Sequence, residues 1–239
     1  MVAGMTLSTV KASFVSAVPD AGYHIELAGG GYYNTAALRS SKVAEIQKQI
    51  PAGVGITLNS LYINPRQFTF QLPLWQEMHK EGFHVAAGVL TTGKAVEIID
   101  GLKAAGIRHV AFKPGSVDGI HQVVSIAAAN PDFPIILQWT GGHAGGHHSF
   151  EDFHQPILAT YHSIRQYENI SLIAGSGFSS ADDVWEYLTG GWSVERFGVQ
   201  PMLFGGFLFS SRIMVAKEVH TSSSVKDLNI AAAGVEDGA

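Results

Sequence analysis

Residues 134–142 read Pro-Ile-Ile-Leu-Gln-Trp-Thr-Gly-Gly, a short apolar run that ends in two glycines. The first four residues of this run carry no polar side chain. They therefore lack the alternation expected of a strand with one face in water. Continuous apolar runs of this length are typical of strands covered on both faces, as in parallel sheets. We therefore expect a buried parallel strand here, with a loop at its carboxyl end.

Seven further short apolar runs alternate with longer segments of helical spacing. The predicted strands, besides 134–140, are 2–4, 24–28, 54–59, 84–89, 108–113, 170–175 and 206–210. The predicted helices are 8–18, 36–50, 65–80, 94–105, 117–129, 153–167 and 181–188. Eight such units predict a (β/α)8 TIM barrel over residues 1–220, with a tail or linker to a larger protein over 221–239. An open doubly wound sheet shows the same alternation, but its fingerprint G-x-G-x-x-G is absent.

The composition excludes several classes of protein. The 239-residue chain has 15 Lys and Arg against 20 Asp and Glu, a net charge of −5, and its basic residues are dispersed, so we expect no nucleic-acid partner. Hydrophobic residues make up 46% and charged residues 15%, which excludes a disordered chain. No apolar run approaches the roughly 18 residues of a membrane span. No secretory leader follows Met1, so we expect a cytoplasmic protein that binds no membrane.

Nine of the 27 glycines gather after predicted strands, at 29–31, 141–142, 145–146, 175 and 177. In a barrel these positions are the βα loops, which carry the active site. Glycine allows a ligand to approach the backbone closely, so we predict a binding site at this edge of the sheet. Ordinary tight turns are the alternative interpretation.

The loop after the seventh predicted strand indicates a phosphate site. Residues 175–183 read Gly-Ser-Gly-Phe-Ser-Ser-Ala-Asp-Asp and run straight into a helix, and Ser210 and Ser211 follow the eighth strand. These two loops form the usual phosphate-binding position of a barrel, where backbone amides and a helix N-terminus face the anion. In the alternative interpretation, Ser179 and Ser180 only cap that helix.

Three of the 11 histidines, His143, His147 and His148, lie within residues 138–152. Their spacing is not the H-E-x-x-H of a zinc helix and the chain has no cysteine, so we expect no metal site. Histidine titrates near neutral pH and can act as a general acid. The pair at 147–148, held after two double glycines, is therefore a candidate proton donor.

Longer motifs are spread over the whole chain. They are MT at 5–6, AGYHIELAGGGYYN at 21–34, GITLN at 55–59, FKPGS at 112–116, GGHHSFED at 145–152, SGF at 176–178, YLTG at 187–190 and AKE at 216–218. Together these motifs resemble the enoyl reductase domain of the fungal and actinobacterial type I fatty acid synthases, which in fungi belongs to the β subunit. That family is an FMN-containing TIM barrel, similar also to nitronate monooxygenases and to flavin-dependent bacterial enoyl reductases.

The resemblance implies a reaction and its partners. NADPH reduces FMN, which passes hydride to the β carbon of a trans-2-enoyl thioester on an acyl carrier protein. The α carbon is then protonated, and the family's catalytic histidine matches His147, with His148 as the alternate. The other partners that the resemblance implies are the remaining domains of a large synthase assembly.

The resemblance also implies which residues hold FMN. Lys113 would reach the N1/O2 region of the ring and stabilise the reduced flavin; an ion pair with a nearby carboxylate is the alternative. Gln138 would bond the ring or the ribityl chain. The residues expected against the ring are Ala3, Gly4, Met5, Thr6 and Asn59, those in the histidine loop are Gly145 and Gly146, and those at the phosphate are Gly175, Ser176, Gly177, Ser210 and Ser211.

The sequence departs from the family pattern at Leu7, where proline is usual, at His143, where fungal members usually show arginine, and at Gly205 and Ser210 near the eighth strand. Two other functions stay open at this point. One is a nitronate-oxidising flavoprotein on the same scaffold. The other is a non-catalytic barrel that builds part of a synthase wall.

Overall fold

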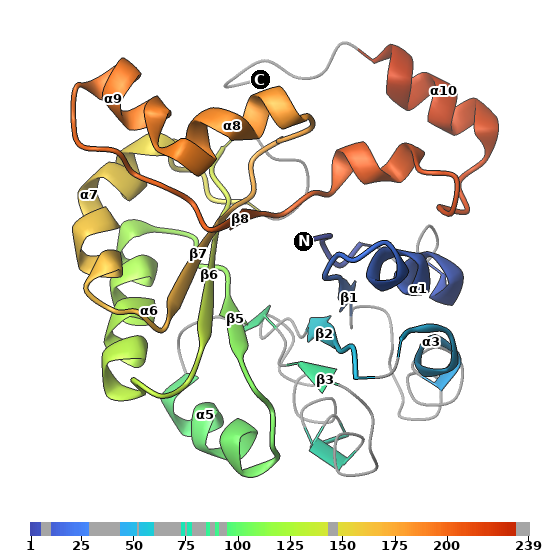
Figure 1. The fold of residues 1–239 in the computed structure, drawn as a ribbon, viewed down its shortest axis with the longest axis horizontal. Helices are drawn as coiled ribbons and strands as arrows, with labels where there is room; N and C mark the ends of the chain where they lie inside the picture. The colour runs from blue at the N-terminus through green and yellow to red at the C-terminus, as the bar shows by residue number, and fades with distance from the viewer. Residues whose placement is uncertain are drawn as a thin grey trace. The chain divides into compact units, whose positions relative to one another are not determined.

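A computed structural model describes residues 1–5, 11–28, 44–51, 53–59, 73–74, 76–77, 85–86, 89–90, 95–142 and 148–232. The chain divides into two compact units. Figure 1 shows the fold with a colour that follows the residue number from the N-terminus to the C-terminus. The described residues of the first unit lie within Met1–Val110 and Ile213–Ala233, and those of the second within Ala111–Arg212. Each unit is described by itself.

The first unit is built on a small parallel sheet. Its strands β1 (Glu26–Ala28), β2 (Ile56–Asn59) and β3 (Val85–Ala86) lie in the order β1-β2-β3. Leu27 of β1 is in register with Leu58 of β2. The other elements of this unit are α1 (Ala12–Asp20), α3 (Ala44–Gln49), β4 (Val89–Leu90), α5 (Ala95–Ala104) and α10 (Ser223–Ala231).

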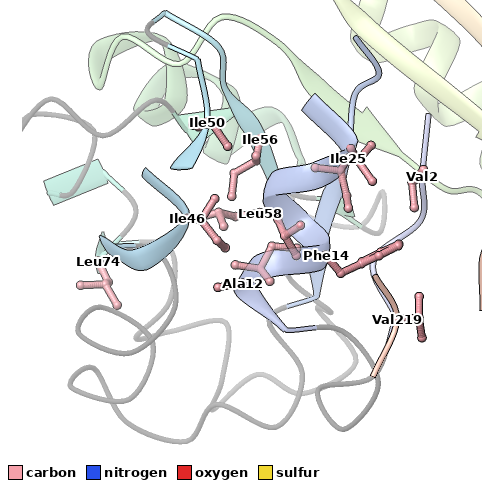
Figure 2. Close-up of a cluster of buried hydrophobic side chains, with 13 residues drawn as sticks. Val2, Ala12, Phe14, Ile25, Ile46, Ile50, Ile56, Leu58, Leu74 and Val219 are labelled. Atoms are coloured by element: carbon pink, nitrogen blue, oxygen red, sulfur yellow. The ribbon is translucent and has the colours of Figure 1, made fainter. Parts of the chain in front are cut away.

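Apolar side chains from these elements form the core of the first unit (Figure 2). Helix α1 contributes Phe14, which is 2% exposed, and strand β1 contributes Leu27 beside the fully buried Ile25. Val219, far along the sequence, packs into the same cluster. The core therefore joins residues between Val2 and Leu74 to Val219, which no local pattern in the sequence predicts.

Two strand predictions in this unit need correction. Residues 2–4 form a single bridge between Val2 and Ile25 instead of a strand. Parallel pairing starts at Val2, but the N–H of Gly4 donates to the Glu26 carboxylate at 3.2 Å, so a side chain takes the place of the next ladder bond. In place of the single strand predicted at 84–89, the described residues belong to two strands, β3 and β4.

The second unit contains the strands β5 (Val110–Phe112), β6 (Ile135–Trp139), β7 (Ile170–Ala174) and β8 (Gly206–Phe207), which lie in that order in one sheet. Strands β6, β7 and β8 pair in parallel. In β6 the side chains of both faces are almost completely covered, as the sequence at 134–140 predicts. Helices α6 (Val117–Ala129) and α7 (His154–Arg165) pack beside β6 and β7 (Figure 1).

Helix ends in the second unit follow from local sequence. Ser116 begins α6 by accepting a hydrogen bond from the N–H of Gly119, and α6 has the predicted bounds. Ser180 begins α8 (Ala181–Thr189), and Gly190, with φ +78°, ends it because a left-handed residue stops the helix.

Three described elements were not predicted from the sequence. They are α9 (Gly191–Phe197), the 3₁₀ helix η3 (Ser211–Val215) and α10, which lies in the predicted tail.

The parallel strands and intervening helices confirm an α/β fold in each unit, whereas the TIM barrel stays a prediction. In the part of the chain that the structure describes, no helix has the length and apolar character needed to cross a bilayer.

Candidate functional site

The carboxyl edge of the second unit's sheet brings several predicted site residues to one side. Lys113 directly follows β5, Gln138 is the last but one residue of β6, and Ser176 lies two residues after β7. Because β6, β7 and β8 are neighbouring parallel strands, Gln138 and Ser176 share one edge of the sheet with the segment after β8, which contains Ser210 and Ser211. Lys113 follows β5, which lies next to β6 in the sheet.

The loops after β6 and β7 are tied directly to each other. The N–H of Gly141 donates to Ser176 Oγ at 2.7 Å, and the same hydroxyl lies 3.3 Å from the Gly141 carbonyl as a donor. The N–H of Gly175 donates to the Trp139 carbonyl at 2.8 Å. The Ser176 hydroxyl and the Gly175 N–H therefore hold the two loops together, and the N–H groups of Ser176 and Gly177 are the ones that the phosphate prediction can still use.

The glycines at this edge are required by close packing within the protein. A Cβ on Gly141 would lie 2.5 Å from the Cα of Phe153, and one on Gly175 would lie 3.0 Å from Thr140 Oγ1. Gly177 has φ +73°, a left-handed conformation that favours glycine. Packing within the protein, which neither interpretation named, accounts for glycine at 141 and 175, and a turn accounts for glycine at 177. The close approach of a ligand stays a prediction.

The N-terminus of α8 is capped by the chain's own side chains. Ser180 Oγ accepts from the N–H of Asp183, and the Asp183 carboxylate accepts from the N–H groups of Ser179 and Ser180 and from the Ser179 hydroxyl, at 2.6–3.0 Å. The Ser179 hydroxyl bond is the largest cause of a lowered pKa of Asp183. The capping interpretation is therefore confirmed for this helix end, and the phosphate site at 175–177, 210 and 211 stays a prediction.

One buried hydroxyl at this edge has no assigned partner. Thr140 is 4% exposed and directly follows β6, and its Oγ1 makes no hydrogen bond within the described part of the chain. A buried polar atom without a partner in the protein usually marks a place where a ligand, an ion or a water binds. Thr140 was not singled out from the sequence, since a lone threonine after a strand carries no distinctive pattern. It fits a polar ligand bound beside Gly175.

The segment that follows the histidine pair folds back onto β6. His148 is exposed, whereas the next residue, Ser149, is 3% exposed. The N–H of Ser149 donates to the Thr140 carbonyl at 2.9 Å, and its hydroxyl donates to the Gly115 carbonyl at 2.8 Å. Sequence reasoning also missed Ser149, although it stands next to the histidine pair.

Other predicted residues are placed as follows. Gln138 is 1% exposed, and Lys113 is half-buried.

In the first unit, Gly4 lies close to β1, where an added Cβ would be 3.0 Å from the N of Ala28. Met5 packs partly on the core cluster. Asn59 is the last residue of β2. The predicted residues that lie outside the described part are Thr6, Leu7, His143, Gly145, Gly146 and His147.

A second pair of histidines lies in the first unit. His24 Nε2 is 2.6 Å from Thr57 Oγ1, and the ring centroid of His24 is 5.8 Å from that of His109. Burial, and after it the neighbouring His109, lowers the pKa of His24 to about 4; burial also lowers the pKa of His109. Both rings are therefore neutral at pH 7, which suits a structural role better than proton donation.

Comparison with known proteins gives a consistent result. Residues 134–239 match the family model described as "Fatty acid synthase subunit beta/Fas1-like, helical". Over 99% of its length the chain is 57% identical to "Fatty acid synthase 2" of Mycosarcoma maydis, 52% identical to "Fatty acid synthase subunit beta" of Schizosaccharomyces pombe and 48% identical to the protein of that name in Saccharomyces cerevisiae. The chain covers 6%, 11% and 12% of these proteins, respectively. It is thus similar, along nearly its whole length, to one segment of much longer fungal fatty acid synthase proteins.

The close contact at Gly141 predicts different outcomes for two neighbouring glycines. Gly141→Ala should lower the free energy of unfolding by about 1–3 kcal/mol, because the new methyl group would overlap the Phe153 backbone. Gly142→Ala is the matched control: its Cβ would meet nothing nearer than the Glu151 carbonyl at 3.7 Å, so its effect should stay within about 0.5 kcal/mol. Urea unfolding followed by circular dichroism measures both. Equal stability of the two variants would contradict the packing described here.

The lowered pKa of His24 predicts a loss of stability in acid. Between pH 6.5 and about 4 the unfolded chain binds a proton at His24 that the folded chain does not bind. The free energy of unfolding should therefore fall as the pH drops through this range, by at most ~1.4 kcal/mol per pH unit for this one group. Urea titrations at several pH values should show a shallower slope for His24→Gln than for the wild type. His162→Gln, at an exposed position on α7, is the control; an unchanged slope in His24→Gln contradicts the prediction.

Proposed function

We propose that this chain is the FMN- and NADPH-dependent enoyl reductase part of a type I fatty acid synthase β subunit. The similarity to fungal synthase proteins over 99% of the chain supports its place in fatty acid synthesis and in an assembly with other synthase parts. The observation that carries the reductase assignment is the second unit's sheet, in which Lys113 follows β5, Gln138 lies near the end of β6, and Ser149, next to His148, bonds the residue after β6. The proposed substrate is a trans-2-enoyl thioester on an acyl carrier protein.

We also propose that the strands belong to one (β/α)8 barrel. In support, the strands of each sheet follow one another in sequence order, and the assigned pairs are parallel. In a barrel, catalytic residues stand at the carboxyl ends of the strands. Lys113, Gln138 and Ser176 have that position within the second unit's sheet.

The donor groups of the second unit fit FMN. The Thr140 hydroxyl, which has no partner in the described part of the chain, offers a bond to a polar ligand, and the N–H groups of Ser176 and Gly177 follow in the neighbouring loop. Ser210 and Ser211 add hydroxyls at the end of β8, and Lys113 adds a positive charge after β5. Asp183 already occupies the α8 N-terminus, so we assign the phosphate to the amides and to the two serines, without a contribution from that helix end. In the proposal the ring contacts come from Ala3, Gly4, Met5, Thr6 and Asn59, with Gly145 and Gly146.

FMN, when bound, supplies the hydride that it receives from NADPH. The chain's own residues then have two tasks. Lys113 holds a positive charge where negative charge develops, which lowers the barrier to the reaction. A histidine of the pair at 147–148 donates a proton to the α carbon, and general acid catalysis of this kind typically contributes about 10²- to 10⁴-fold.

His147 and His148 separate the two half-reactions in a mutational test. We expect His147→Ala to bind FMN and to be reduced by NADPH at the wild-type rate, while the enoyl-dependent reoxidation of the flavin slows by about 10²-fold or more, because only this step needs the proton donor. Stopped-flow absorbance of the flavin measures both rates.

His148→Ala is the matched control at the adjacent position. A wild-type reoxidation rate in His147→Ala together with a slow rate in His148→Ala moves the assignment to His148. Wild-type rates in both variants would rule out a histidine of this loop as the proton donor. Reoxidation that follows addition of a nitroalkane and not of an enoyl thioester would favour a nitronate-oxidising flavoprotein, and failure to bind FMN a structural role.

A further inference from the structure

Ser149 is the most extensively bonded polar side chain next to the histidine pair. Its hydroxyl donates to the Gly115 carbonyl at 2.8 Å and accepts from the N–H of Glu151 at 3.0 Å. Its own N–H donates to the Thr140 carbonyl at 2.9 Å. One buried serine thus fixes three backbone groups from three different stretches of the chain.

These bonds close the base of the loop that carries the histidines. The N–H of Gly142 donates to the Glu151 carbonyl at 3.1 Å, so two backbone bonds join the segment that leaves β6 to the segment that enters α7. The Trp139 indole adds a bond to the Phe153 carbonyl at 2.8 Å. His148 directly precedes Ser149, so the histidine pair is joined in sequence to this bonded segment.

The hydroxyl of Ser149 also connects this base to the β5 loop. Gly115 stands two residues after Lys113, with Pro114 between them, and Ser116 next to it caps α6. The segment that accepts the Ser149 bond is therefore itself held at both ends, by β5 and by α6. The Ser149 hydroxyl thus joins the segment that follows His148 to the segment that follows Lys113.

We propose that Ser149 is a positioning residue that sets the distance between the histidine proton donor and the Lys113 side of the site, an inference that rests on the proposed reductase function. Ser149 does not touch the reacting atoms. It acts through the backbone, because a general acid must stand within hydrogen-bond distance of the atom it protonates. A displacement of about 1 Å at such a donor reduces the rate by about 10²-fold.

Three variants test this proposal in the FMN-loaded chain. Ser149→Ala removes the bond to Gly115, and Ser149→Thr keeps a hydroxyl. The control Ser125→Ala removes an exposed hydroxyl of α6 that bonds the His121 carbonyl within the same helix. We expect Ser149→Ala to slow the enoyl-dependent reoxidation of the flavin by about 10- to 100-fold and to leave its reduction by NADPH within about twofold. Ser149→Thr should recover most of the lost rate, and Ser125→Ala should match the wild type.

Hydrogen exchange of the backbone gives a readout that does not depend on activity. In Ser149→Ala the amide of Glu151 loses its acceptor, so a peptide covering residues 142–152 should exchange faster than in Ser149→Thr and Ser125→Ala. Should Ser149→Ala fail to fold, Ser149→Cys fills a similar volume with a weaker donor and takes its place in the comparison.

Each outcome decides the proposal. A wild-type reoxidation rate in Ser149→Ala, an equal loss in both half-reactions, or no recovery in Ser149→Thr would overturn it. If the wild type itself shows no enoyl-dependent reoxidation, the proposed function has failed. In that case faster exchange confined to residues 142–152 in Ser149→Ala still supports Ser149 as the residue that fixes the loop, and unchanged exchange overturns it.

Discussion

The contact between Gly141 and Phe153 is the constraint on which the arrangement of the second unit depends. A Cβ on Gly141 would stand only 2.5 Å from the Cα of Phe153, so the end of β6 and the start of α7 lie too close for any side chain at this position. The Trp139 indole then reaches the Phe153 carbonyl, and the Gly141 N–H reaches Ser176 after β7. Residues 149–153 are also bonded to the end of β6 and to the residues that follow it, and the exposed His148 directly precedes them.

Much of the fold could be predicted from the sequence because hydrophobic spacing is a local property. Strand β6 is covered on both faces as its apolar run indicates, and helix α6 has its predicted bounds because Ser116 and the spacing of its buried residues specify them. The prediction of a strand at residues 2–4 was wrong, because the side chain of Glu26, 22 residues further along, accepts a hydrogen bond from the N–H of Gly4. Such a competition between side chain and backbone leaves no local sequence signal.

The candidate site was predicted less completely than the fold. The glycines correctly indicated where the loops lie, but at Gly141 the physical reason is contact with Phe153, from a helix that begins a dozen residues later. The sequence did not predict that the Asp183 carboxylate accepts hydrogen bonds from the N–H groups of Ser179 and Ser180. Ser149 and Thr140 were missed because their roles come from burial, which a single serine or threonine in a sequence does not reveal.

The described histidines differ in their burial. Burial lowers the pKa of His24 and of His109, whereas His148 lies exposed at the surface. The most direct measurement of the central claim is anaerobic stopped-flow of the FMN-loaded chain, reduced by NADPH and then mixed with a trans-2-enoyl thioester. The account predicts that the flavin absorbance returns at a rate that increases with enoyl thioester concentration. A chain that binds no FMN, or a reduced flavin that the enoyl thioester does not reoxidise, would contradict it.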